Sequence, residues 1–190
     1  MRQTPSQTVG PYFAYGLVPA QYGYELSSLW GSEIAEARTP GEPITLMGRV
    51  FDGSGEAVFD ALIEIQQADA QGRHLHSLEQ SRLTGFRGFG RMGTGTRDDR
   101  CFVFRTIKPG ASADGHAPHL DVILTLRGLL NHLYTRIYFE EDAAQQALDP
   151  VLAQVPQARR ATLMARRDEC GIHRFDIHLQ GPAETVFFDV

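Results

Sequence analysis

Alternating apolar and polar residues recur in short stretches from residue 44 to the end of the chain. In residues 133–139, for example, Thr135 and Ile137 share one face while Tyr134 and Arg136 share the other, because successive side chains of a strand point to opposite faces. Clusters of glycine, proline and aspartate separate these stretches, as they do between strands. The pattern predicts strands over residues 44–51, 61–67, 101–107, 120–126, 133–139, 172–179 and 185–188.

Helical periodicity is confined to one region, about residues 143–167, where Pro150 and Pro156 divide it into short pieces. No repeat of fixed period is visible, which excludes solenoids and propellers. Short strands separated by turn residues indicate a mainly β protein. We therefore predict an antiparallel β-sandwich over residues 44–190, with one short helical excursion near residues 143–167.

Residues 1–43 differ from the rest and form an irregular arm. Five prolines and five glycines interrupt any helix or strand longer than a few residues. Tyrosines, leucines and a tryptophan nevertheless make this arm too apolar for a disordered tail. We expect it to pack in a groove, either on its own β-domain or on a neighbouring chain.

Length and composition narrow the classes of function. The 190 residues suffice for one sizeable domain, and a net charge of −5 argues against nucleic acid as the main partner. No apolar run has the roughly 20 residues that span a bilayer, and the amino terminus lacks the apolar stretch of a signal peptide. Cys101 and Cys170 have no metal-type spacing and form no disulfide framework. We expect a cytoplasmic protein with no nucleic-acid or membrane partner.

The most suggestive candidate chemistry lies in residues 116–121, where His119 and Asp121 point the same way in a strand and so can share a site. Three interpretations remain open. His119 is a buried or interface histidine satisfied by hydrogen bonds, a metal ligand completed by His74 or His76, or the base of a His–Asp pair. No serine or cysteine lies in a nucleophile elbow, so nucleophilic catalysis has no support.

Two further features have simpler interpretations. Residues 85–95 are rich in glycine but are followed by no helix, so we predict a mobile or bulged surface loop and no phosphate cradle. Arg127 directly follows an apolar strand. It is either a surface residue or a fixed guanidinium aimed at a carboxylate, which its planar fork binds well.

Several segments, in their order and spacing, resemble the intradiol ring-cleaving dioxygenases. The similarity covers nearly the whole chain. The segments are TPSQTVGPY at 4–12, GRVFDG at 48–53, IEIQQADA at 63–70, FRTIKPG at 104–110, TRIYF at 135–139 and RFDI at 174–177.

The resemblance implies that this chain lacks an iron site. Catalytic members hold a non-haem ferric ion with two tyrosines and two histidines, and the matching positions here are His74, Ser112, His119 and Asp121. His116 stands where the family has an arginine that helps the chemistry. Because tyrosinate stabilises ferric iron, the loss of both tyrosines implies no metal and no catalytic residue in this chain.

The same resemblance implies a partner. Heteromeric members of the family pair an iron-free alpha chain with a beta chain that holds Fe(III), and the active site lies near their shared interface. This chain would then be an oxidoreductase subunit that is not catalytic alone, acting with a beta chain, an aromatic carboxylate and O2. The positions that match the pocket lining are Thr8, Gly10, Pro11, Tyr12 and Arg127.

Two alternatives to this interpretation remain. The chain is a stand-alone binding or scaffold module that kept the fold and lost catalysis, or a homomeric metal enzyme rebuilt on His74, His119 and Asp121.

Overall fold

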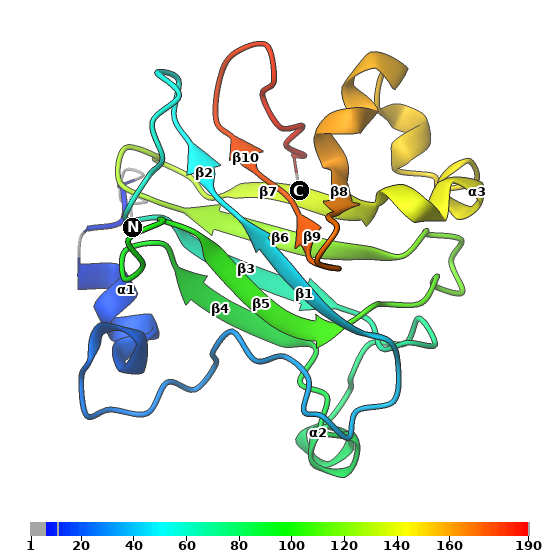
Figure 1. The fold of residues 1–190 in the computed structure, drawn as a ribbon, viewed down its shortest axis with the longest axis horizontal. Coiled ribbons are helices and arrows are strands. Elements are labelled where there is room, and N and C mark those ends of the chain that lie inside the picture. Colours follow the sequence, from blue (N-terminus) through cyan, green and yellow to red (C-terminus); the bar gives the residue numbers. More distant parts are fainter. Residues whose placement is uncertain (1–6, 11, 190) are drawn as a thin grey trace, which may run out of the picture.

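The structure, a computed structural model, describes residues 7–10 and 12–189 and shows a mainly β architecture (Figure 1). In the described chain a separate short pair joins β2 (Val50–Phe51) to β10 (Ile177–His178). The other eight strands form one sheet, in the order β4 (Phe89–Gly93), β3 (Leu62–Gln67), β6 (His119–Thr125), β7 (Leu133–Phe139), β8 (Met164–Arg167), β9 (His173–Arg174), β1 (Pro43–Gly48) and β5 (Phe102–Ile107).

The β-rich class is confirmed, but the predicted arrangement, an antiparallel sandwich, is wrong in detail. Three pairs are parallel, namely β1–β9, β7–β8 and β2–β10. One of these pairs involves β8, which begins beside β7, with Met164 opposite Tyr138, and ends in an antiparallel pair with β9, with Arg166 opposite Arg174. This single strand joins the two halves of the sheet, which curls into a nearly barrel-like shape.

The arm closes the gap between the edge strands of this sheet. Ile34 donates its N–H to the Arg105 carbonyl of β5 at 2.8 Å, and its own carbonyl accepts the N–H of Arg87 just before β4. Its side chain is fully buried in the core. The second half of the arm therefore packs on this chain's own sheet.

The prediction of a surface loop over residues 85–95 is wrong, because β4 occupies residues 89–93. A Cβ at Gly90 would lie 2.5 Å from Cγ1 of Ile34, so only glycine lets the arm approach this strand closely. The glycines that suggested a loop thus serve an edge strand. The helix α2 (Leu78–Thr84), which precedes β4, was not predicted from the sequence.

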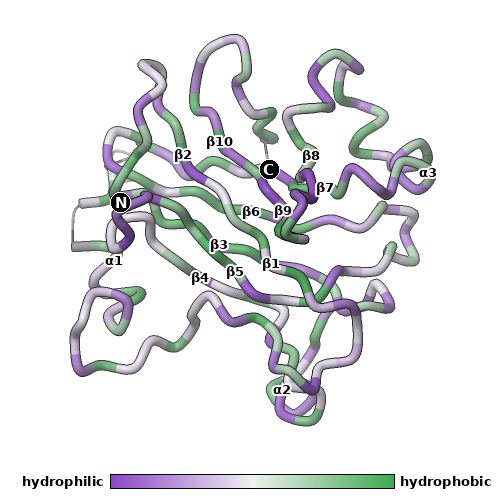
Figure 2. The backbone as a smooth tube through the Cα atoms, in the orientation of Figure 1, coloured by the Kyte–Doolittle hydropathy of each residue, from purple (hydrophilic) through white to green (hydrophobic). Residues whose placement is uncertain are grey.

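The core lies where the inner faces of the curled sheet meet, and hydrophobic residues concentrate along the central strands (Figure 2). On β7 the predicted alternation is confirmed, since Ile137 and Phe139 are fully buried in this core while Arg136 lies on the opposite face. That opposite face is covered by the helical excursion, where Leu152, Val155 and Leu163 pack with Tyr138 in a second cluster.

The helical excursion is confirmed as a series of short turns: η2 (Glu140–Asp142), α3 (Ala143–Gln146), η3 (Leu152–Gln154) and η4 (Gln157–Leu163). Its last four predicted residues form β8 instead. In the arm, α1 (Tyr12–Leu17) and η1 (Pro19–Tyr22) lie at the end of the molecule opposite α3 (Figure 1). None of the described helices has the length and apolar character needed to span a bilayer.

The remaining strand predictions hold with local breaks. The segment 44–51 divides at Arg49, whose N–H donates to the Asp176 carboxylate at 2.9 Å instead of continuing a ladder. The segment 172–179 divides into β9 and β10, and the segment 185–188 contributes only a bridge between Tyr134 and Phe188.

Candidate functional site

The predicted site residues gather near the two ends of β6. His119 begins the strand and Asp121 follows on the same face, whereas Arg127 lies two residues beyond its last residue, Thr125. Because a strand rises about 3.3 Å per residue, roughly 20 Å separates the two groups. They form two separate sites: the arm pocket, around Arg127, and the histidine cluster, around His119.

The arm pocket is a cavity of about 90 Å³ between the first helix of the arm and the loops that flank β3 and β6. A cavity of roughly 150 Å³ is known to hold a benzene ring. A ring bound here would therefore extend beyond this cavity. The residues that matter below are Gly10, Phe13, Tyr22, Phe59, Asp60 and Arg127.

Arg127 is held by the turn that precedes β3. Its Nε donates to the Asp60 carboxylate, and its guanidinium carbon lies 5.3 Å from the centre of the Phe59 ring. A cation at this distance from an aromatic ring is attracted by the ring's quadrupole. Arg127 is thus a fixed guanidinium, and the carboxylate that fixes it belongs to this chain.

Thr8 connects the arm to the loop that carries Arg127. Its hydroxyl accepts the N–H of Gly128 at 2.8 Å and lies 3.4 Å from the Leu126 carbonyl, to which it donates. Both contacts flank Arg127 in sequence. In this structure the Thr8 side chain therefore holds the backbone behind Arg127.

Gly10 lines the arm pocket, and no atom lies within 4 Å of the place where a Cβ would be. This open space is compatible with close approach of a ligand to the backbone. Pro11 and the side chain of Tyr12 lie outside the described residues.

Phe59, Asp60 and Tyr22 belong to the arm pocket and were not expected from the sequence. Tyr22 packs edge-to-face with Tyr15, with ring centres 4.6 Å apart. Burial raises the pKa of Tyr22, and the nearby Tyr15 and Asp60 raise it further. The aromatic character of the arm was the only sequence signal for Tyr22, and no local motif distinguished Phe59 or Asp60.

The histidine cluster lies on the face of β6 and β7 that is turned away from the main core. The register places Asp121 opposite Arg136 and His119 opposite Tyr138. The Asp121 carboxylate accepts hydrogen bonds from Arg136 Nε at 3.0 Å and from the Tyr134 hydroxyl. Its negative charge is therefore balanced from the neighbouring strand.

His119 is engaged by its own backbone neighbourhood. Its Nδ1 lies 2.7 Å from the Ala117 carbonyl, which can only accept, so Nδ1 carries the proton. Its Nε2 lies 3.6 Å from the Asp121 carboxylate, beyond hydrogen-bond distance. Burial lowers the pKa of His119 and favours the neutral ring.

Asp149 closes the histidine cluster from the helical excursion. Its fully buried carboxylate accepts backbone N–H groups of Ala117, Val151 and Leu152, each at 2.8 Å. Burial alone would raise the pKa of Asp149, but these bonds outweigh it and hold the pKa below its ordinary value. His116 lies 3.7 Å from this carboxylate and 3.3 Å from Arg136 Nη1.

The residues at the family's iron-ligand positions do not fit a ferric ion. His74 is exposed on the loop before α2, and the Ser112 hydroxyl accepts the N–H of His116 at 3.3 Å. Asp121 is occupied by the Arg136 guanidinium, whose positive charge opposes a metal cation nearby. Among the described residues, no three histidine, cysteine or acidic side chains form a group that could hold a metal.

A comparison with known proteins decides the family. A family model described as "Dioxygenase" matches residues 10–181. The chain belongs to the intradiol dioxygenase family. A solved relative is the dioxygenase domain of a dioxygenase carbohydrate-binding protein fusion from Streptomyces sp. SirexAA-E. It is 25% identical with a TM-score of 0.59, and the match covers 94% of this chain and 99% of that one.

Within this family the chain is similar to subunits of one enzyme. It is 53% identical to the protocatechuate 3,4-dioxygenase alpha chain of Burkholderia cepacia, over 100% of this chain and 98% of that protein. The alpha chain of Pseudomonas putida is 41% identical over 98% and 96%. The beta chain of Burkholderia cepacia is 35% identical over 66% and 56%.

Proposed function

We propose that this chain is the alpha subunit of a heteromeric protocatechuate 3,4-dioxygenase and leaves the ferric ion to a beta chain. The enzyme cleaves 3,4-dihydroxybenzoate with O2 to 3-carboxy-cis,cis-muconate, a step of aromatic degradation in the β-ketoadipate pathway. One observation carries the proposal. The chain matches alpha chains over its full length, yet its residues at the iron-ligand positions do not fit the metal.

The bound iron supplies activation of the dihydroxylated ring, and that chemistry takes place on the beta chain. The contribution of this chain is to bind and orient. The Arg127 guanidinium offers positive charge and a planar donor fork to the substrate carboxylate, which suits an aromatic acid rather than an uncharged catechol. Gly10 lines the arm pocket on this side.

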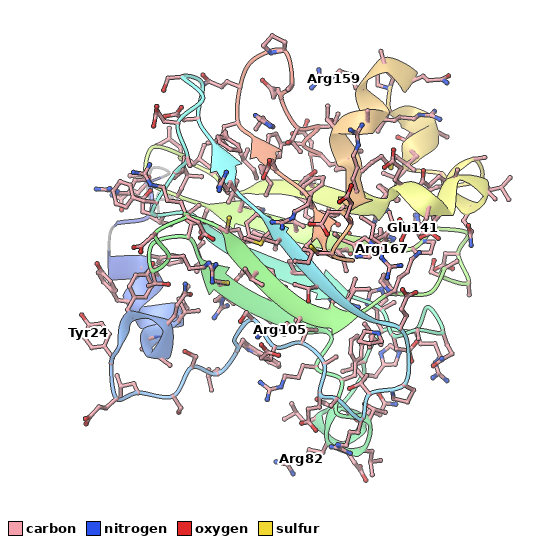
Figure 3. The ribbon with its side chains drawn as sticks, in the orientation of Figure 1. Tyr24, Arg82, Arg105, Glu141, Arg159 and Arg167 are labelled. Carbon is pink, nitrogen blue, oxygen red and sulfur yellow. The ribbon has the colours of Figure 1, made fainter. Side chains whose placement is uncertain are left out.

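The exposed apolar residues of the arm support the assembly with a partner chain. Phe13, Tyr24, Leu26 and Leu29 are between 43% and 87% exposed. Tyr24 projects outward from the arm (Figure 3). Apolar side chains gathered on one exposed segment are typical of a surface that another protein covers. The small, incomplete arm pocket lies beside them, so a partner seated there would supply the missing walls.

Coexpression tests the proposal. Three preparations are compared: this chain alone, this chain coexpressed with a beta chain, and the beta chain alone as the matched control. We expect neither iron nor oxygen uptake with 3,4-dihydroxybenzoate in the lone chain, strong oxygen uptake when both chains are present, and far weaker uptake in the beta chain alone. Ferric iron with strong tyrosinate colour in the lone chain would contradict an iron-free subunit. Purification from the native source without an iron-bearing partner would instead favour a free-standing module.

A further inference from the structure

We infer that Asp60 is a positioning residue that aims the Arg127 guanidinium at the carboxylate of the substrate. The inference rests on the proposed function, because it assumes that an aromatic carboxylate enters the arm pocket. Neither residue is near the other in sequence, and they are separated by 67 positions.

The first support is the way the guanidinium is held. Asp60 bonds the Nε edge, and the ring of the adjacent Phe59 lies 5.3 Å from the guanidinium carbon. Two consecutive residues of one turn thus constrain the group. No other acceptor among the described residues bonds it, so both terminal nitrogens keep their N–H donors for a ligand.

The second support is the difference in exposure within the pair. The Asp60 side chain is 20% exposed and that of Arg127 is 46% exposed. The carboxylate therefore lies behind the guanidinium, and the cation forms the accessible part of the pair. An anion that approaches the arm pocket meets donors before it meets the negative charge.

Two effects of Asp60 on anion binding oppose each other. Its negative charge repels an anion that approaches Arg127. Its bond to Arg127 also removes side-chain freedom that an unrestrained arginine would lose on binding. Since the Arg127 end of the pair faces solvent, which screens the charge of Asp60, the ordering effect should exceed the charge effect, and loss of Asp60 should weaken substrate binding.

The test uses the assembled two-chain enzyme and compares Asp60→Ala, Asp60→Asn, Arg127→Ala and the double variant. We expect Asp60→Ala to raise KM for 3,4-dihydroxybenzoate roughly threefold to tenfold with kcat changed less than twofold, and Arg127→Ala to raise KM at least as much. In the Arg127→Ala background, Asp60→Ala should add little, because the two residues act as a unit. Asp60→Asn, which keeps an oxygen acceptor of the same shape, should recover part of the loss.

Catechol distinguishes a specific role of Asp60 from a merely structural one, because it has both hydroxyls but lacks the carboxylate that Arg127 is proposed to bind. Its inhibition constant should not change in either single variant. Asp98→Ala is the matched control, because Asp98 is an exposed carboxylate three residues after Gly95, which lines the arm pocket. If the alanine variant fails to assemble, the asparagine variant carries the same comparison.

The outcomes separate the inference from the proposed function. An unchanged KM in Arg127→Ala would remove the proposed substrate contact itself. A raised KM in Arg127→Ala with an unchanged or lowered KM in Asp60→Ala and Asp60→Asn would overturn only the role of Asp60. Equal losses for 3,4-dihydroxybenzoate and catechol, or additive effects in the double variant, would also overturn it.

Discussion

Strand β6 has an arginine–carboxylate pair near each end, and the two arginines differ in exposure. The Arg127 side chain is 46% exposed and bonds Asp60 through one nitrogen. The Arg136 side chain is 14% exposed, bonds Asp121 and contacts His116. Val151 and Val155 of the helical excursion line a cavity beside Arg136, while the first helix of the arm borders the region around the first pair.

Residue type alone therefore does not decide which arginine–carboxylate pair can bind a ligand. A guanidinium has five N–H donors, and its availability depends on how many of them the protein itself uses. In the histidine cluster, buried charges must be balanced internally, because an unpaired buried charge is costly. In the arm pocket, solvent tolerates unused donors, so they remain free for a substrate.

Asp149→Ala has the largest expected effect, and it tests whether the charged groups of the histidine cluster stabilise the fold. Loss of the buried carboxylate leaves three backbone N–H groups without an acceptor, and we expect the free energy of unfolding to fall by about 3 kcal/mol. Urea unfolding of the purified protein measures this. Asp114→Ala, at an exposed aspartate, is the control and should stay within about 0.5 kcal/mol. Equal free energies of unfolding in both variants would mean that the Asp149 carboxylate does not stabilise the fold.

A second substitution, Arg136→Met, should separate the two arginines by kind of effect. It leaves the Asp121 carboxylate without its cation, and we expect a stability loss of about 2 kcal/mol, below the value for a fully buried pair. KM for 3,4-dihydroxybenzoate should stay within twofold, the opposite of the expectation for Arg127→Ala. Thermal unfolding and steady-state kinetics on the same preparation check both parts. A raised KM with unchanged stability would reverse the comparison.

On our proposal, a beta chain covers the apolar side chains of the arm that are exposed in this chain by itself. Leu29→Asp should therefore weaken association with the beta chain roughly tenfold, about 1.4 kcal/mol, which is within the value of one buried leucine. Leu148→Asp is a matched control on the helical excursion, since Leu29 and Leu148 are 87% and 81% exposed. Sedimentation of the mixed chains measures both. Weaker association in the Leu148 variant alone would place the interface at the other end.

The smallest effect concerns pH. Burial lowers the pKa of His119, so the unfolded chain takes up this proton first as the pH falls. The contribution of His119 to the free energy of unfolding should be fully present above the ordinary histidine pKa of about 6.5. It should be lost as the pH falls from there through the lower pKa of the folded protein. His119→Gln should flatten this decline between pH 7.5 and 5.5 in urea unfolding, whereas His132→Gln, at an exposed site, should not. A decline that is equal in all three proteins would exclude His119 as its cause.

Much of the fold could be predicted from local pattern. The alternation in residues 133–139 identified the core face of β7, and Pro150 and Pro156 indicated short helical turns. Residues 85–95 misled, because glycine signals a loop locally but here permits Ile34 to approach β4. The parallel pairs were equally hidden, since each joins strands that lie far apart in the sequence.

The β-rich class and the two faces of its main strands follow from the sequence alone, and the family resemblance aligns His74 and Ser112 with the iron-binding tyrosines. These properties depend on residue type and on spacing within one segment. Only the tertiary structure decided that Asp60 holds Arg127 and that Arg136 occupies Asp121. Such pairs join distant segments, and strand register, burial and the covering elements determine which side chains meet and which remain open to a ligand.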